Sequence, residues 1–305
     1  MNNLSVWVNA LRLRTLPLAT ASIIVAAGIA VHEHMFDPVI FFLSLITALL
    51  LQILSNLAND YGDALNGVDD ESRVGPQRAM QTGAISAQSM RLGIVITTLL
   101  TLISGLSLLI VALGDDIFSW LLFIVLGILA IIAAITYTMG HVPYGYRALG
   151  DLAVFLFFGL LGVIGSFYLY GHHVDWLLLL PASSIGMLSA AVLNINNMRD
   201  VESDSKHHKT TLVVLFGRKS AFNYHLFLVV GAPLLTSYYL YCLETTQTWQ
   251  YIFLLAMSPL IKSCLALKEA IDENDLSGER FNEQLKNTAM STFVFSLLFA
   301  LVLIA

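Results

Sequence analysis

The stretch Asn56-Leu57-Ala58-Asn59-Asp60-Tyr61-Gly62-Asp63 stands where a long apolar run ends. Within it, Asn56, Asp60 and Asp63 are spaced i, i+4 and i+7, so on a helix they share one face. Asp69 follows six residues after Asp63 and adds another carboxylate to the same segment. The pattern predicts a helix that ends in a cluster of carboxylate and amide side chains.

A second segment of the same kind, Asn197-Met198-Arg199-Asp200-Val201-Glu202-Ser203-Asp204, closes a later apolar run. Its Asn197, Asp200 and Asp204 fall at i, i+3 and i+7, again on one helical face. The offset between the two motifs is 141 residues at both ends, since 197 − 56 and 204 − 63 both equal 141. Matching positions in two halves indicate a parallel internal repeat and one site built from both motifs.

The composition is that of an integral membrane protein. Hydrophobic residues make up 57% of the 305 residues and charged residues only 12%, against roughly 25% charged in soluble domains. Lipid offers the edges of an open sheet no hydrogen-bond partners, and the short alternating segments of a β-barrel are missing from the sequence. We therefore expect an all-α fold, one domain over 1–305, with nine transmembrane helices in a bundle around a central cavity. The expected spans are 16–32, 38–58, 92–113, 118–138, 152–171, 176–196, 222–243, 249–268 and 288–305.

The basic residues predict the orientation of these spans. With the N-terminus in the cytoplasm, 14 of the 15 Lys and Arg residues fall in cytoplasmic segments or at their edge. The opposite loops hold only acidic charges, which is the positive-inside pattern. The C-terminus would then be periplasmic, and spans 2–5 would correspond to spans 6–9 in the repeat. The net charge of −6 gives no reason to expect a nucleic-acid partner.

The paired carboxylates predict a metal site. Two carboxylates about 5 Å apart repel by about 3 kcal/mol at an effective dielectric of 20, so several on one face need a cation. Polar residues are common at helix ends, but two clusters at matching positions favour a function. Mg²⁺ prefers oxygen ligands and is commonly shared with phosphates. The expected catalytic residues are Asp60, Asp63, Asp200 and Asp204, and the expected metal ligands are these four and Asp69.

Basic and aromatic side chains near the motifs predict the substrate. Arg73, Arg78, Lys206 and Lys209 could hold phosphate oxygens. Carboxylates, Mg²⁺ and basic side chains at an apolar cavity suit a pyrophosphate with a long apolar tail. Aromatic rings could shelter a developing allylic cation, although anchoring at the membrane interface is the alternative. These rings are Tyr137, Tyr144 and Tyr146, and the amides Asn56, Asn59 and Asn197 are further candidates for substrate binding.

Together the motifs resemble the two aspartate-rich motifs of the UbiA-type intramembrane aromatic prenyltransferases. The likeness extends through 75–83, 143–151 and 194–200, and it is greatest to the branch that prenylates 1,4-dihydroxy-2-naphthoate in menaquinone synthesis. The resemblance implies a UbiA-like bundle in the bacterial inner membrane and a Mg²⁺-dependent enzyme. The implied substrates are polyprenyl pyrophosphate and 1,4-dihydroxy-2-naphthoate, and the implied product, after loss of pyrophosphate and CO₂, is a demethylmenaquinol.

Two alternatives remain open from the sequence. One is a different acceptor such as 4-hydroxybenzoate; against it, Arg147 is the one basic residue in its loop, where that branch of the family carries a lysine. The other is a transporter, although transporter sites are usually near the bilayer midplane. Arg147, flanked by Tyr144 and Tyr146, is the expected partner of the acceptor carboxylate, and the alternative is a plain positive-inside charge.

Overall fold

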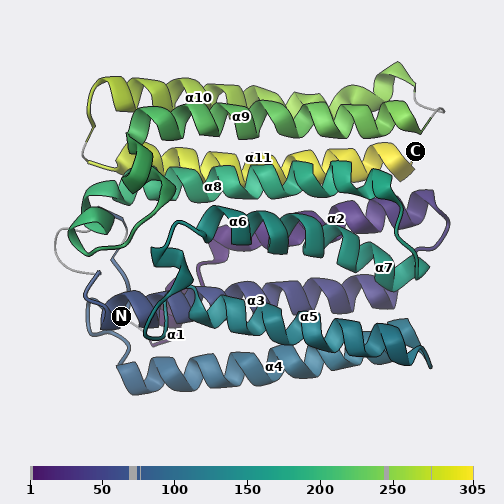
Figure 1. Cartoon of the computed structure of the whole chain (residues 1–305), viewed down its shortest axis with the longest axis horizontal. Coiled ribbons are helices and arrows are strands. Elements are labelled where there is room, and N and C mark those ends of the chain that lie inside the picture. The colour runs from purple at the N-terminus through teal and green to yellow at the C-terminus, as the bar shows by residue number, and fades with distance from the viewer. Residues whose placement is uncertain (1–2, 69–73, 76, 244–246, 276, 305) are drawn as a thin grey trace.

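The protein is a bundle of helices that run side by side along its longest axis (Figure 1). The computed structural model describes residues 3–68, 74–75, 77–243, 247–275 and 277–304, and these contain no β-strand beyond an isolated bridge between Arg147 and Thr210. The all-α prediction is confirmed. The long elements are α2 (Leu16–His32), α3 (Pro38–Leu65), α4 (Ala87–Leu113), α5 (Ile117–Thr136), α8 (Leu179–Lys206), α9 (Leu212–Cys242), α10 (Met257–Asp272) and α11 (Glu279–Ile304).

The predicted number of nine spans is not confirmed. Over the described ranges, eight helical segments are long and apolar enough to cross a membrane, and α2 is shorter, with 17 residues. The span 150–171 is one of the eight and is composite: α6 (Gly150–Val154), a π-helix, η3 (Phe155–Gly165), and α7 (Ser166–Gly171). Another begins as a 3₁₀-helix, η5 (Thr248–Ala256), before α10.

Acidic residues begin several of these helices. Asp37 precedes Pro38, the first residue of α3, and its carboxylate accepts hydrogen bonds from the backbone N–H groups of Val39 and Ile40. Asp116 caps α5 in the same way, and Asp175 caps the short 3₁₀-helix η4 (Trp176–Leu178) that leads into α8. A carboxylate at this position satisfies orphan N–H groups and favours the positive end of the helix dipole. The acidic residues in the loops away from the Lys- and Arg-rich segments therefore have a structural role as helix caps.

The core lies where α8 packs against α9 and where α11 packs against α2. Two close approaches require glycine. A Cβ on Gly28 of α2 would lie 2.7 Å from the Cα of Ala300 in α11, and a Cβ on Gly159 would lie 2.7 Å from the Cα of Gly186 in α8. These contacts fix α2 and the π-helical segment close to α8 and α11, which lie between α9 and α2 in Figure 1.

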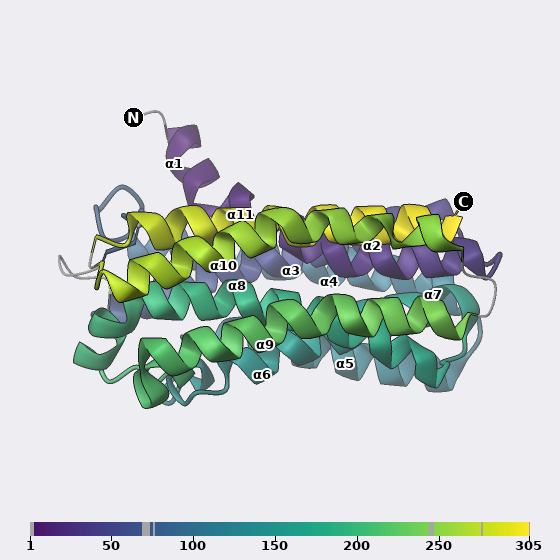
Figure 2. The same ribbon diagram turned by 90° about the horizontal axis from the view of Figure 1, so that it is seen from above.

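The two motif helices end at the same end of the bundle. Helices α3 and α8 each have 28 residues, and both continue past the predicted ends of their apolar spans to include the acidic motifs. Their first residues are 141 positions apart (179 − 38), and so are their last residues (206 − 65). The short α1 (Asn3–Ala10) projects from the bundle at that end (Figure 2). The internal repeat itself stays a prediction.

Candidate active site

The first motif holds two buried aspartates at the end of α3. Asp60 and Asp63 are each only 2% exposed. Arg12, from the turn before α2, forms an ion pair with Asp60. Arg78 contacts both acids, with its Nη1 2.7 Å from Asp63 Oδ2 and its Nε 3.4 Å from Asp60 Oδ1. Two arginines from separate segments therefore neutralise the pair of carboxylates that α3 places on one face.

The second motif is organised around Arg199, which is buried. Its guanidinium binds Asp200 through two contacts, Nε to Oδ1 at 2.7 Å and Nη2 to Oδ2 at 2.5 Å. It also donates to Asn196 Oδ1 at 2.8 Å and to Asn282 Oδ1, in α11, at 2.6 Å. This network ties the end of α8 to α11 and holds the Asp200 carboxylate in a fixed orientation.

Lys209 joins the two motifs. Its Nζ lies 3.9 Å from Asp63 Oδ1 and 3.5 Å from Asp204 Oδ1, and the residue is 7% exposed. Burial lowers the pKa of Lys209, but the charges of Asp63 and Asp204 outweigh it and raise the pKa above its ordinary value. A charged lysine therefore connects acidic side chains that are 141 positions apart in the sequence.

The predicted tyrosines surround this lysine from the loop before α6. Tyr146 donates a hydrogen bond to Asp63 Oδ1 at 2.7 Å, and Lys209 Nζ lies 5.5 Å from the centre of its ring. Tyr137 and Tyr144 form an edge-to-face pair with ring centres 5.3 Å apart. Burial raises the pKa of Tyr144 to about 12 and also raises that of Tyr137, so both phenols stay neutral near pH 7.

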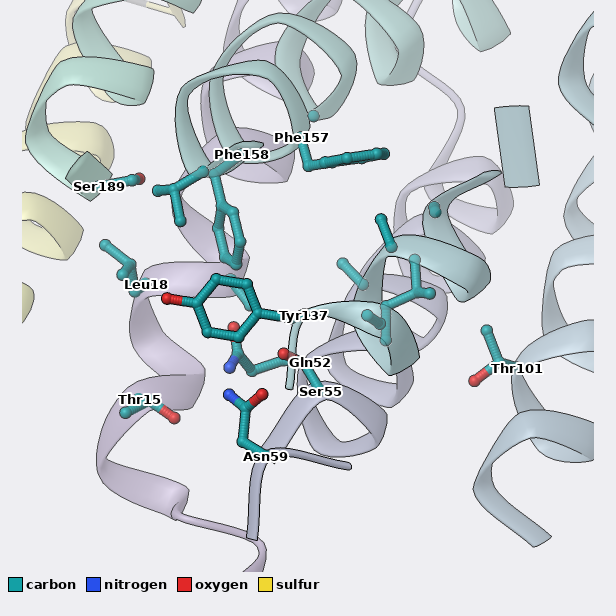
Figure 3. Close-up of a pocket in the computed structure, with 18 of the residues that line it drawn as sticks. Thr15, Leu18, Gln52, Ser55, Asn59, Thr101, Tyr137, Phe157, Phe158 and Ser189 are labelled. Carbon is teal, nitrogen blue, oxygen red and sulfur yellow. The ribbon is translucent and has the colours of Figure 1, made fainter. Parts of the chain in front are cut away.

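A cavity of about 1000 Å³ opens beside these residues. We call six of its lining residues the mouth: Asn59, Asp60, Asp63, Arg78, Arg199 and Lys209. From the mouth the cavity follows α3 back to Ser44, which is 19 residues, or about 28 Å of helix. Its body is largely apolar, and in Figure 3 the ring of Tyr137 lies between Phe158 on one side and Asn59 and Gln52 on the other.

Other predicted residues lie elsewhere. Asn56 donates to Leu11 O at 3.0 Å and to Thr15 Oγ1 at 3.2 Å, so it anchors the turn before α2. The buried Asn197 and the exposed Arg147 do not contribute to the lining of the described cavity. Asp200, Asp204 and Tyr146 are also absent from the lining, although Asp200 contacts the lining residue Arg199 and the other two contact the lining residue Lys209. Asp69 and Arg73 fall outside the residues that the structure describes.

The carboxylates fit a metal in donor chemistry. Oδ2 of Asp204 is buried and accepts no hydrogen bond, although its other oxygen faces Lys209. Such an oxygen is one that a hard cation would satisfy. Across the described part of the chain, however, no three acidic, histidine or cysteine side chains converge as a ready-made metal cluster. Each motif acid contacts an arginine or lysine instead, because four neighbouring carboxylates need cations to share a buried site.

Three residues of this site were missed by the sequence prediction. Arg12 is 48 positions from Asp60, and Asn282 is 83 positions from Arg199, so only the folded chain brings them together. Arg199 stood in the predicted motif, yet the prediction gave it no role. A signal was available for Arg199 alone, because a basic residue beside a predicted buried aspartate needs a partner.

With this geometry established, comparison with known proteins defines the class. The model of the UbiA prenyltransferase family matches residues 20–277, and this chain belongs to that family. A 1,4-dihydroxy-2-naphthoate octaprenyltransferase of Escherichia coli (strain K12) is 45% identical over 296 residues, covering 97% of this chain and 94% of the relative. The enzyme of the same name from Haemophilus influenzae is 45% identical over 267 residues, covering 86% of this chain and 85% of the relative.

Solved structures confirm the fold. A UbiA homolog from Archaeoglobus fulgidus, in a structure bound to GPP and Mg²⁺, aligns with a TM-score of 0.59 and 19% identity, covering 96% of this chain and 98% of that chain. At that identity the likeness concerns the fold alone. The predicted UbiA-like architecture and family membership are therefore confirmed, while the roles of individual residues stay predictions.

Proposed function

We propose that this protein transfers a polyprenyl chain from polyprenyl pyrophosphate to 1,4-dihydroxy-2-naphthoate, as its relatives' names describe. The bond from the terminal prenyl carbon to the pyrophosphate oxygen breaks, and that carbon forms a bond with the ring carbon that bears the carboxylate. The carboxyl-bearing ring carbon loses CO₂, and the electrons of that bond restore the aromatic ring. The products are pyrophosphate, CO₂ and a demethylmenaquinol.

The observation that carries this proposal is the charged mouth on a long apolar cavity. Asp63 and Asp204, from separate halves of the chain, meet at Lys209, beside a largely apolar space that follows α3 for about 28 Å. A headgroup of phosphates fits the mouth, and a long apolar polyprenyl chain fits the body. Burying such a tail stabilises binding by about 0.8 kcal/mol per methylene, so the body supplies much of the affinity for the donor.

Mg²⁺ fits the mouth through oxygen ligands from both motifs. Asp60 and Asp63 at the mouth would hold it together with Asp200 and Asp204, which contact the mouth residues Arg199 and Lys209. Asp204 Oδ2 is a buried oxygen that accepts no hydrogen bond. When bound, the metal neutralises the pyrophosphate and makes it a better leaving group. Arg78 and Lys209 are placed to take phosphate oxygens, since both already lie against Asp63. The GPP- and Mg²⁺-bound structure of the archaeal homolog supports this assignment by its fold.

The neutral rings at the cavity protect the reacting carbon. Tyr137, Tyr144 and Phe158 line the space next to the mouth, and their faces can stabilise an allylic cation without reacting with it. Their bulk also keeps water away from that cation, which would otherwise be captured as a prenyl alcohol. The protein therefore needs no covalent nucleophile, because positioning and electrostatics perform the catalysis.

The multi-pass chain resides in the bacterial inner membrane, with its N-terminus in the cytoplasm and its C-terminus in the periplasm. The distribution of Lys and Arg supports that orientation. It places both motifs at the cytoplasmic face, where a water-soluble aromatic acid and Mg²⁺ are available.

The experiment is a product assay in membranes that contain the protein. They are incubated with Mg²⁺, polyprenyl pyrophosphate and either 1,4-dihydroxy-2-naphthoate or 4-hydroxybenzoate, and products are identified by mass. We expect a prenylated naphthalenediol that has lost CO₂, and no such product from membranes with Asp63→Asn. Prenylation of 4-hydroxybenzoate alone would assign a different acceptor. Unconsumed pyrophosphate donor would exclude a transferase and favour transport.

A further inference from the structure

The basic side chains of the cavity differ in whether they are already paired. In the described part of the protein, five of them line it: Arg12, Arg78, Arg199, Lys209 and Lys286. The first four each contact a motif carboxylate, as given above. The side chain of Lys286 forms no ion pair or hydrogen bond with another described residue. It is therefore a cationic group that remains available to a ligand in this cavity.

Lys286 lines the cavity from α11. It follows Asn282 by one turn of α11, and Asn282 binds Arg199 of the second motif. Its neighbour Leu285 packs with Leu18 of α2 and Val192 of α8. The lysine is thus placed where α2, α8 and α11 meet, apart from the α4 and α5 side that supplies much of the apolar lining.

We propose that Lys286 binds the carboxylate of the aromatic acceptor, an inference that rests on the proposed function. The pyrophosphate needs the cations of the motifs, and those already lie against Asp60, Asp63, Asp200 and Asp204. The acceptor carries its own negative charge into the same cavity and requires a separate cation. Lys286 and Arg147, the residue expected from the sequence, are both exposed, but of the two only Lys286 lines the cavity.

The chemistry of a lysine suits this substrate. Its ammonium is a compact charge on a flexible stem, so it can hold a carboxylate without fixing it in a fork of two hydrogen bonds. That carboxyl group leaves as neutral CO₂, and one mobile contact is lost more easily than a bidentate pair. The acceptor would then lie between Lys286 and the prenyl carbon, with its ring against the aromatic lining.

The test compares Lys286→Met and Lys286→Arg with Lys268→Met, an exposed lysine of α10 that does not line the cavity. In membranes, Lys286→Met should raise the KM for 1,4-dihydroxy-2-naphthoate about tenfold, equivalent to about 1.4 kcal/mol, and leave the KM for polyprenyl pyrophosphate unchanged. Lys286→Arg should recover most of this loss. Lys268→Met should behave as the wild type.

A competition assay separates the charge from the shape of the pocket. Inhibition by 1-hydroxy-2-naphthoate should weaken about tenfold in Lys286→Met, while inhibition by its methyl ester should stay the same. An unchanged acceptor KM, a rise in the donor KM, or equal weakening of acid and ester would each overturn the proposal. Wild-type membranes that fail to prenylate the naphthoate would refute the proposed function instead. If they prenylate 4-hydroxybenzoate, the same variants are measured with that acid.

Discussion

Replacing Lys209 with methionine would remove the charge that the two motifs share. Its Nζ lies 3.5 Å from Asp204 Oδ1 and 3.9 Å from Asp63 Oδ1, and at an effective dielectric of 20 each attraction amounts to about 4 kcal/mol. The cost of burying the lysine offsets much of this. Breaking a buried ion pair nevertheless destabilises proteins by about 3–5 kcal/mol, because the partner charge is left buried. We expect the lower end, about 3 kcal/mol, since Arg78 still neutralises Asp63.

The assay is thermal unfolding of the detergent-solubilised protein without Mg²⁺, with the folded fraction measured by size-exclusion chromatography. Lys209→Met should lower the apparent Tm by several degrees, and Lys209→Arg should restore most of the loss. Lys219→Met is the matched control, because Lys219 is exposed on α9 and forms no ion pair with another described residue. An unchanged Tm in Lys209→Met would refute the bridging role, and so would equal losses in Lys209→Met and Lys219→Met.

The same variant makes a prediction about pH. The pKa of Lys209 is raised in the folded protein, so its contribution to stability is fully present below the unfolded-state pKa of about 10.4. It is lost only as the pH rises through the higher folded-state pKa. Where its carboxylate partners are also ionised, between about pH 8 and about pH 9, the difference in Tm between wild type and Lys209→Met should therefore be constant. A difference that shrinks within this interval would mean that Lys209 titrates there.

Three further predictions concern catalysis and topology. Asp60→Asn and Asp200→Asn should each reduce turnover by about two orders of magnitude or more while the protein still inserts; near-normal turnover in both would exclude the two-motif site. Tyr146→Phe should reduce turnover about tenfold by removing the hydrogen bond to Asp63, without changing the acceptor KM. With both native cysteines replaced, Met35→Cys should react with an impermeant thiol reagent from the periplasm and His207→Cys should not; the reverse would invert the orientation.

The helices of the site could be predicted because their signals are local. Apolar runs about 20 residues long and the i, i+4, i+7 spacing of Asn56, Asp60 and Asp63 depend on residues within two turns of one another. The helix ends differ from the predicted ends of the spans. Helix α3 continues to Leu65 because the motif acids, paired with Arg12 and Arg78, remain buried beyond the apolar run.

Partners contributed by distant segments could not be predicted. Nothing near Asp60 in the sequence indicates that Arg12 will reach it, and nothing near Arg199 indicates Asn282. The structure does not place Arg147 in the lining of the cavity, and the reason is local. It follows directly after the 3₁₀-helix η2 (Tyr144–Tyr146), in which successive side chains point in directions about 120° apart. Since Tyr146 turns inward to Asp63, Arg147 faces outward.

The charges of the site suggest how the donor and the metal depend on each other. Asp60, Asp63, Asp200 and Asp204 are matched by Arg12, Arg78, Arg199 and Lys209, so these eight side chains, when ionised, carry no net charge. A pyrophosphate that took Arg78 and Lys209 alone would leave Asp63 and Asp204 uncompensated in a buried site, at a cost of several kcal/mol. A divalent cation replaces the lost positive charge on those carboxylates and adds its own contact to the phosphates. Each ligand therefore raises the affinity for the other by the same factor, and the donor binds as its magnesium complex.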